Sequence, residues 1–493
     1  MSGVAAAGAA LMLLAACRRA PSPASENASV TLRMGVGQWP SSPSEGMSAL
    51  ASLISVESLA RLGDDGRPTA QLARDWQVSP DGVVLTVNLR PGVKFHDGSP
   101  LTSAAVATAL RTGLPGIMGP AFKDFDSVSA PNDNQVVLRF TSPSPFLLDA
   151  LETPIQKPAT VPGTAPIATG PFVIADPSRT EMRANGEYYL GRPMIDRVVV
   201  QAFPSVRAAW AEMLRGQIDM LYEVGVDALD SLEASTSIST FTFTRRYQYA
   251  IVLNTDTEVF RPKEVRRALN TAIDRDGLVR EALNGHATAS TGPVWPRNYA
   301  FPRETSDFHV DPAAAAHLLA SKRGASARGS ALHFTCLVRA DALHERIALV
   351  IKRQLQAVGV DMTIEEVSID RLVGSLKDRQ FEAVLMEMVS APTLLRPYQM
   401  WHSGGAAGAN MPAIDAALDE IRHAASDDAY VKSVAAFQQA VADDPPAIFL
   451  AWIERARAVS KRFTVPPGEP GRDILSTMRL WKPAADARQA TRN

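Results

Sequence analysis

Residues 72–110, LARDWQVSPDGVVLTVNLRPGVKFHDGSPLTSAAVATAL, constrain the fold of this chain more than any other stretch. Apolar and polar side chains alternate through residues 84–90, which predicts a half-buried strand. Turn sequences flank it, because Pro presets φ and Gly tolerates a positive φ. A helix should begin at Thr102, whose hydroxyl can cap it. The stretch therefore predicts a turn, strand, turn and helix unit, and its acids and histidine form no catalytic set on spacing alone.

The same stretch closely resembles the signature of extracellular solute-binding protein family 5, the peptide, oligopeptide and nickel receptors of ABC importers. The family pattern runs roughly W-x-V-S-x-D-G, then an alternating strand, then L-R-x-G-V-K-F-H-D-G-x-P-L-T-A. The matching residues are Trp76, Val78, Ser79, Asp81, Gly82, Leu89, Arg90, Gly92, Val93, Lys94, Phe95, His96, Asp97, Gly98, Pro100, Leu101 and Thr102. In the family this run is mainly structural, so it identifies a fold rather than a ligand contact.

Resemblance to the family continues over about residues 30–482. The segment VRRALNTAIDRDGLV is a close match, and it lies in residues 264–283, which are predicted as one amphipathic helix. Pro262 is placed to begin this helix, and Asn284-Gly285 can end it in the left-handed conformation. Residues 49–62 are also predicted as a helix. Further matches are the segments ESLARLGDDGRPTAQLA, PSPFLLDAL, TGPF and YYLGRPMID.

The resemblance implies an α/β fold, the two-lobed periplasmic-binding-protein fold with an extra subdomain and a ligand cleft between the lobes. Lobe I would hold residues 30–248 with the extra subdomain, completed by residues 462–485, and lobe II residues 249–461. The two hinge crossovers between the lobes are expected near residues 249–254 and 459–465.

The amino terminus reads as an export signal. The apolar run of residues 4–16 is too short to span a bilayer and has the length of a signal-peptide core. Leu14-Ala15-Ala16-Cys17 resembles the bacterial lipobox, which implies cleavage before Cys17 and lipidation of that residue. We therefore predict a lipoprotein signal peptide at residues 1–17, a flexible tether at 18–29, and a periplasmic or cell-surface protein anchored by lipid. Residues 1–16 contain no Lys or Arg, which suggests an upstream start codon; a plain secretory signal is the alternative.

Composition and motifs exclude several other classes of function. A formal net charge of −2 over 493 residues gives no reason to expect a nucleic-acid partner. Cys17 and Cys336 belong to no Cys/His cluster with zinc spacing, so neither a metal nor another cofactor is predicted. Neither G-x-S-x-G nor a Walker A run occurs, and Ala348 stands where H-E-x-x-H after His344 would need its second His. An enzyme is not expected.

The leading functional hypothesis is a solute receptor of an ABC importer, monomeric, which captures a peptide-like or other small solute and delivers it to permease subunits in the membrane. One alternative is a sensory co-receptor that binds a ligand without transport. Another is a cleft enzyme with an unrecognised set of catalytic residues.

The ligand is constrained by one departure from the family. Peptide-binding members carry an Asp that takes the ligand α-amine, within a pattern D-x-x-l-x-g-W-x-x-D-x-x-D-P. In residues 381–396 of this chain Met388 replaces the Trp, and Ser390-Ala391-Pro392 replaces the acidic run. A buried ammonium without a carboxylate partner is costly. We therefore expect poor binding of peptides with a free amino terminus unless Glu387 or another acid substitutes.

Aromatic and polar residues near the expected cleft are the candidate ligand-binding set. A place in the core is the alternative for Trp401 and the tyrosines, which should share a strand face if they alternate regularly. A solvated loop or turn is the alternative for the Arg and Asn, and a ligand to a metal chelate is one interpretation of the His. The set is Trp39, Tyr247, Tyr249, Arg396, Trp401, His402 and Asn410.

Overall fold

The computed structural model describes residues 29–37, 43–157, 165–303, 308–322, 332–467 and 473–485. The predicted signal peptide with Cys17, nearly all of the predicted tether, and Trp39 lie outside the described residues. In the part that is described, no helix is both long enough and apolar enough to cross a membrane.

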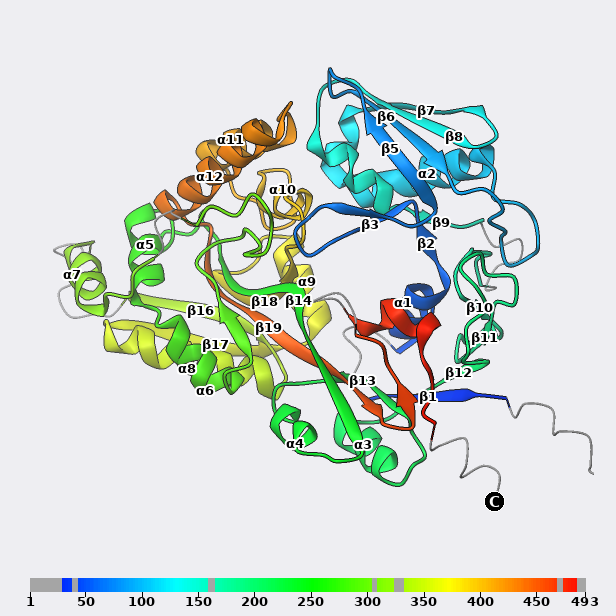
Figure 1. Cartoon of the computed structure of the whole chain (residues 1–493). Coiled ribbons are helices and arrows are strands. Elements are labelled where there is room, and N and C mark those ends of the chain that lie inside the picture. Colours follow the sequence, from blue (N-terminus) through cyan, green and yellow to red (C-terminus); the bar gives the residue numbers. More distant parts are fainter. Residues whose placement is uncertain are drawn as a thin grey trace, which may run out of the picture.

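One mixed sheet of 11 strands runs through the molecule (Figure 1). On one side of it, β1 pairs in parallel with both of its neighbours. Beyond one of these neighbours, the strands toward the sheet edge are antiparallel. These strands are β1 (Thr31–Val36), β10 (Phe172–Ile174), β11 (Glu181–Ala184), β12 (Arg197–Ala202) and β13 (Met220–Val224). On the other side β16 pairs in parallel with both of its neighbours. The strands there are β15 (Ala287–Ala289), β16 (Leu332–Arg339), β17 (Val360–Val367) and β18 (Ala383–Val389).

Two long antiparallel strands, β14 (Ile238–Leu253) and β19 (Ala447–Ser460), join the two sides. Residues 238–244 of β14 pair only with β19, whereas residues 247–253 also pair with β18. The chain therefore crosses at 245–246 on β14 and near 453–454 on β19, some residues before the positions predicted for each crossover. We call the described residues of 29–244 and 454–485 the first lobe, and those of 247–453 the second lobe.

The extra subdomain of the first lobe is a four-stranded antiparallel sheet covered by α2 (Ser103–Met118). Its strands are β5 (Ala73–Val78), β6 (Val84–Leu89), β7 (Phe125–Asn132) and β8 (Gln135–Phe140). β6 alternates between buried and half-buried residues, as predicted. The hydroxyl of Thr102 accepts a hydrogen bond from the Ala105 amide at 3.2 Å, which confirms the predicted helix cap.

The predicted helix at residues 49–62 is wrong in its second half. α1 (Pro43–Ser55) ends where the Ser55 carbonyl accepts a hydrogen bond from the Gly170 amide at 3.0 Å. Short strands replace the expected helical turns because the backbone pairs instead with distant segments. The replacing strands are β2 (Glu57–Ser58) and β3 (Ala60–Leu62), which pair with β9 (Pro154–Ile155) and β4 (Pro68–Ala70) respectively. The lobe also contains α3 (Val206–Leu214), α4 (Leu229–Glu233), η1 (Gly119–Asp124), η2 (Pro145–Leu147), η3 (Asp149–Glu152), η5 (Ile474–Leu480), β20 (Phe463–Thr464) and β21 (Lys482–Pro483).

Residues 264–283 form two helices rather than the one predicted. The Asp274 carboxylate accepts a hydrogen bond from the Gly277 amide at 2.8 Å and begins a new helix, which interrupts the first. Asn284 ends the second helix at φ 53°, as predicted. The helices of the second lobe are α5 (Lys263–Ala272), α6 (Arg275–Leu283), α7 (Pro312–Lys322), α8 (Ala342–Ala357), α9 (Ile369–Lys377), α10 (Leu395–Trp401), α11 (Pro412–Arg422) and α12 (Asp427–Asp443).

Side chains of the family-like segments hold these elements together. Buried Arg275 donates to the carbonyls of Ser290 and Phe449 at 2.9 and 2.7 Å. His96 Nε2 lies 3.0 Å from the Gly170 carbonyl oxygen, and burial lowers the pKa of the imidazole. Both side chains form hydrogen bonds with buried backbone carbonyl oxygens, so these family-like residues stabilise the fold and need no ligand to explain them.

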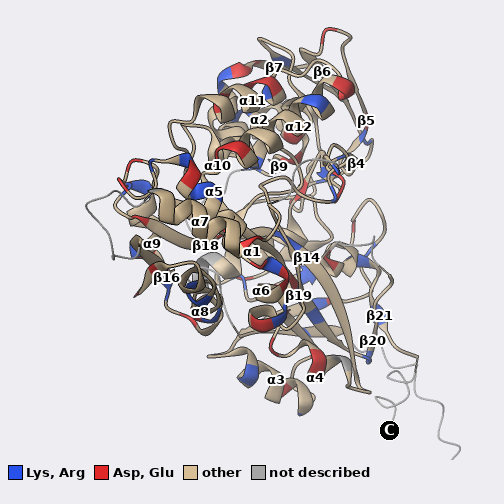
Figure 2. Cartoon of the chain, turned by 90° about the vertical axis from the view of Figure 1, so that its left-hand side faces the viewer, with Lys and Arg blue, Asp and Glu red and all other residues tan. Residues whose placement is uncertain are grey.

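The extra subdomain also touches the second lobe, in the α10–α11 region seen beside it in Figure 1. The rings of Phe146 and Tyr398 meet edge to face with centroids 5.8 Å apart. A buried ion pair between Asp124 and Arg422 crosses the same contact. Positive and negative residues are interspersed along the chain in Figure 2, with neither sign dominating that view.

Candidate functional site

The main interlobe cavity, here called the cleft cavity, has a volume of about 540 Å³ and lies beside the crossover on β14. This size is typical of small-molecule sites. One wall comes from α1, β3 and η3 of the first lobe, and the opposite wall from β14, β18 and α10. Its lining includes Leu53, Glu57, Arg61, Leu62, Asp149, Glu152, Arg246, Tyr247, Val389, Pro392, Thr393 and Arg396.

A second space of about 450 Å³, the crossover cavity, adjoins the first and shares Leu53, Arg61, Arg246 and Tyr247 with it. Arg457 on β19 forms part of its wall and is stacked between aromatic rings. The two cavities therefore form one branched space along the strands that link the lobes.

Arginines line this space, and most of them are engaged. Arg246 donates to the Leu62 carbonyl at 2.8 Å, and Arg396 donates to the Gln399 side chain at 2.8 Å. Arg457 forms two hydrogen bonds to Asp473. Carboxylates line this space as well as arginines, and these hydrogen bonds fix the geometry of the three arginines before a solute arrives.

The carboxylates that line the two cavities are already occupied as hydrogen-bond acceptors. Glu152 accepts from the Leu62 amide at 2.8 Å, and Asp64 accepts from Arg297 at 2.8 Å. Buried Asp149 accepts a hydrogen bond from the Thr393 hydroxyl, and burial raises the pKa of Asp149 to about 7. A solute ammonium would therefore have to compete for an acid that is already paired or readily protonated.

Glu387 was the acid that could have replaced the missing Asp. Its side chain lies on the side of the strands away from the cleft cavity. It lines a separate rear cavity of about 210 Å³, where it lies 3.2 Å from Arg245. Arg455 and Glu223 are in the same network, 3.3 Å apart. Glu387 is thus committed to an interlobe ion-pair network and does not line either cavity of the cleft space.

The two candidate tyrosines do not share a face. Tyr247 lines the cleft and crossover cavities, whereas Tyr249 is 1% exposed and packs against His344 with ring centroids 5.3 Å apart. β14 changes its register against β19 between Thr244 and Gln248, at the crossover itself. Such an irregularity bends the strand and redirects its side chains, so regular alternation failed as a guide here.

The remaining candidates separate into cleft, core and surface positions. Arg396 lines the cleft cavity. Trp401 is 1% exposed and packs edge to face on Phe449 with centroids 5.2 Å apart, which makes it a core residue in this structure. His402 lies 3.6 Å from Asp419, and Asn410 is exposed. The described residues contain no group of three or more His, Cys, Asp and Glu side chains placed to hold a metal.

Sequence reasoning missed Arg61, Arg246 and Asp149. The paired arginines at 245–246, immediately before an apolar strand, were a usable signal for Arg246, because a charged pair at a crossover must face solvent or a cavity. Arg61 and Asp149 carried no such signal, since their positions depend on segments that are distant in sequence.

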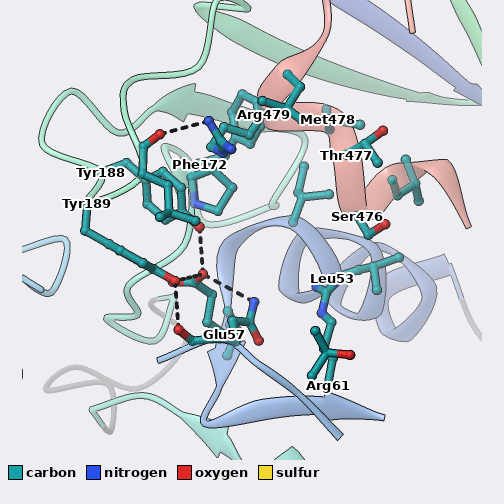
Figure 3. A pocket seen from close by; sticks show the side chains of 18 of the residues that line it. Leu53, Glu57, Arg61, Phe172, Tyr188, Tyr189, Ser476, Thr477, Met478 and Arg479 are labelled. Carbon is teal, nitrogen blue, oxygen red and sulfur yellow. Dashed lines mark hydrogen bonds between the residues drawn. The ribbon is translucent and has the colours of Figure 1, made fainter. Parts of the chain in front are cut away.

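A third space of about 340 Å³, the lobe cavity, opens within the first lobe between α1 and η5 (Figure 3). Buried Glu57 stands at its edge. The carboxylate accepts hydrogen bonds from Tyr188 at 2.7 Å, Thr169 at 2.9 Å, Tyr189 at 3.0 Å and Gln71 at 3.2 Å. Burial raises the pKa of Glu57. All four donors lie in segments whose sequence resembles the family, so these segments meet around one buried carboxylate.

Residues 67–410 match the family described as Bacterial extracellular solute-binding proteins, family 5 Middle. The chain belongs to this family. The oligopeptide-binding protein AppA of Bacillus subtilis is 24% identical over 451 residues, which is 83% of each chain. A putative ABC transporter peptide-binding protein of Brucella ovis is 29% identical over 272 residues, half of each chain. The fold and the solute-receptor function expected from the sequence are thereby confirmed.

Solved structures support the two-lobed binding-protein fold. NikZ from Campylobacter jejuni in complex with Ni(L-His) has a TM-score of 0.77 at 22% identity, covering 92% of this chain and 99% of that one. AppA from B. subtilis with a nonapeptide has a TM-score of 0.76 at 22% identity, with the same coverage. AgaA in complex with agropinic acid, from A. tumefaciens R10, has a TM-score of 0.73 at 22% identity, again with that coverage.

Proposed function

We propose that this protein is the substrate-binding subunit of an ABC importer, which holds one small solute in the cleft cavity and presents it to permease subunits in the membrane. The observation that carries the proposal is the cleft cavity of about 540 Å³ at the strand crossover, lined from both lobes. A solute there contacts the first lobe through α1 and β3 and the second through β18 and α10.

Proteins of similar structure bind chemically different solutes, so the fold by itself leaves a broad range of solutes open. The three solved structures named above contain a nickel–histidine complex, a nonapeptide and agropinic acid. The lining of this cleft narrows the range of solutes, because its acids already accept hydrogen bonds from other residues of the protein. Peptides with a free amino terminus are therefore poor ligands, and neutral or anionic solutes are better ones.

Binding and lobe movement are coupled through the crossover strands. Only two described strands connect the lobes, and β14 carries an irregularity at its crossing point. A solute that contacts both walls stabilises the closed arrangement relative to the open one. Release to the permease then requires the lobes to separate.

A library of small solutes tests this proposal by thermal shift and small-angle scattering. Ligand at 100 times its Kd stabilises the folded state by about 2.7 kcal/mol, which raises the melting temperature measurably. We expect the same ligand to lower the radius of gyration if the free form is open. A library of peptides, organic acids and metal chelates that gives no shift at all contradicts the proposal.

The export signal adds a proposal about location. Lipid attached to Cys17 would anchor the protein at the membrane surface, with residues 18–29 as a tether. Protein made in a lipoprotein-competent host should carry acyl mass at its mature amino terminus, and Cys17→Ser should remove it. An unacylated wild-type amino terminus contradicts the anchor.

A further inference from the structure

Arg61 and Leu53 both line the cleft cavity, the crossover cavity and the lobe cavity, so they stand at the junction of all three. Arg61 lies on β3, opposite Thr69 of β4. Its neighbours Ala60 and Leu62 are buried, while Arg61 itself is half-buried. Figure 3 shows its side chain extending toward α1.

The guanidinium of Arg61 has no hydrogen bond or ion pair with any described residue. Every other arginine in the described lining of the three cavities has one. The others are Arg90 and Arg479, which donate to carbonyls, and Arg245, Arg246, Arg396 and Arg457. A partly buried charge without a partner in the protein is unfavourable, so an anion bound here would offset that cost.

Glu57 is near Arg61 but does not neutralise it. Four neutral donors already surround that carboxylate, and burial raises the pKa of Glu57. Both effects leave the positive charge of Arg61 available to a group that enters the cavities. Its planar fork suits the two oxygens of a carboxylate or phosphate.

An apolar wall lies beside this charge. Leu53 is 40% exposed, and it lines the same three cavities as Arg61. Deeper in the lobe cavity the lining continues with Phe172, Leu475 and Met478. A bound molecule that covers these side chains would gain apolar burial as well as a charge-assisted contact.

We infer that Arg61 anchors an anionic solute, a carboxylate or phosphate whose apolar portion packs on Leu53 and extends into the lobe cavity. This inference rests on the proposed function and names its substrate class. It commits the receptor to amphipathic anions rather than to metal complexes or free-amine peptides.

The test uses N-acetyl amino acids with apolar side chains, their C-terminal amides, and phenyl phosphate, titrated by calorimetry. We expect the acids to bind at least tenfold more tightly than the uncharged amides, in line with the strength of charge-assisted hydrogen bonds. Phenyl phosphate separates a phosphate site from a carboxylate site. Amides that bind as tightly as their acids overturn the inference.

Arg61→Gln should abolish the preference for acids over amides and should not lower the melting temperature measured without ligand. Arg207→Gln is the matched control, because Arg207 is an exposed arginine of the same lobe that lines none of these cavities. Retention of the preference in Arg61→Gln overturns the inference. If peptides or chelates bind to wild type and these anions do not, the inference fails while the proposed receptor function stands; binding of nothing in any class defeats both.

Discussion

The two sides of the crossover strands differ in how their charges are paired. Arg245, Arg455, Glu223 and Glu387 line the rear cavity and form an ion-pair network that joins the lobes; Arg245 and Glu223 also border the crossover cavity. Among the arginines that line the cleft cavity, Arg246 and Arg396 donate to neutral oxygens, and the Arg61 guanidinium has no hydrogen bond or ion pair with a described residue. The adjacent residues Arg245 and Arg246 on β14 thus have different partners. The rear face stabilises the arrangement of the lobes, and the cleft face keeps charge available for a ligand.

The largest expected effect comes from the paired tyrosines. Tyr249→Ala should lower the free energy of unfolding by about 4 kcal/mol, because it removes a buried aromatic ring from the second-lobe core. Tyr247→Ala should cost less than about 1 kcal/mol, since that side chain is half-buried and borders the cleft cavity. Urea unfolding measures both. Equal losses would mean that the two faces are not distinct.

The adjacent arginines give the second comparison. Arg245→Met should destabilise the protein by about 3 kcal/mol, because it leaves the Glu387 carboxylate without its cation partner, whereas Glu223 keeps Arg455. Arg246→Met should cost less than about 1 kcal/mol, since its approach to Asp64 is 3.7 Å and Asp64 keeps Arg297. Thermal unfolding of the two variants measures the difference. If Glu387→Gln does not recover part of the Arg245→Met loss, the rear network is not a coupled unit.

The response to pH should also differ between the faces. Asp149 has a folded pKa of about 7, above its ordinary value of 3.8, so the folded state binds the extra proton between those values. Stability should therefore fall as pH rises from about 4 to about 7, by about 3 kcal/mol. In the rear cavity burial acts to raise the pKa of Asp341, but hydrogen bonding and the charge of His344 lower it overall.

Asp149→Asn should flatten the slope between pH 4 and pH 7 when melting temperatures are measured across that range. Asp341→Asn is the control, since its lowered pKa makes it contribute a pH dependence only below about pH 4. A slope that persists in Asp149→Asn would assign the effect to another group.

The smallest expected effect is that of Arg396→Ala. Its guanidinium is half-buried and bonded to Gln399, three residues away on the same helix, so the change in stability should stay within about 0.5 kcal/mol. Affinity for an N-acetyl amino acid should fall by less than in Arg61→Gln. Calorimetry that found the reverse order would move the anchoring charge to the second lobe.

Much of this protein could be predicted from local sequence alone. The alternation at residues 84–90, the cap at Thr102 and the helix end at Asn284 depend on neighbouring residues, and the structure agrees with each. The long match around residues 72–110 was enough to predict the family, whereas the poor binding of free-amine peptides expected from the missing acid near Ser390 stays a prediction. Local chemistry determines these features, because turns, caps and alternation act over a few residues.

Only the tertiary structure decided which side chains border the cleft. Trp401 became core and Tyr249 was separated from Tyr247, because burial and strand irregularities are set by partners distant along the chain. Arg61 is ordinary in sequence and becomes distinctive only when α1, β3 and η5 meet around it. Whether a charged side chain has a partner depends on the residues that the fold brings around it. The sequence of residues 60–62 alone therefore could not have identified Arg61.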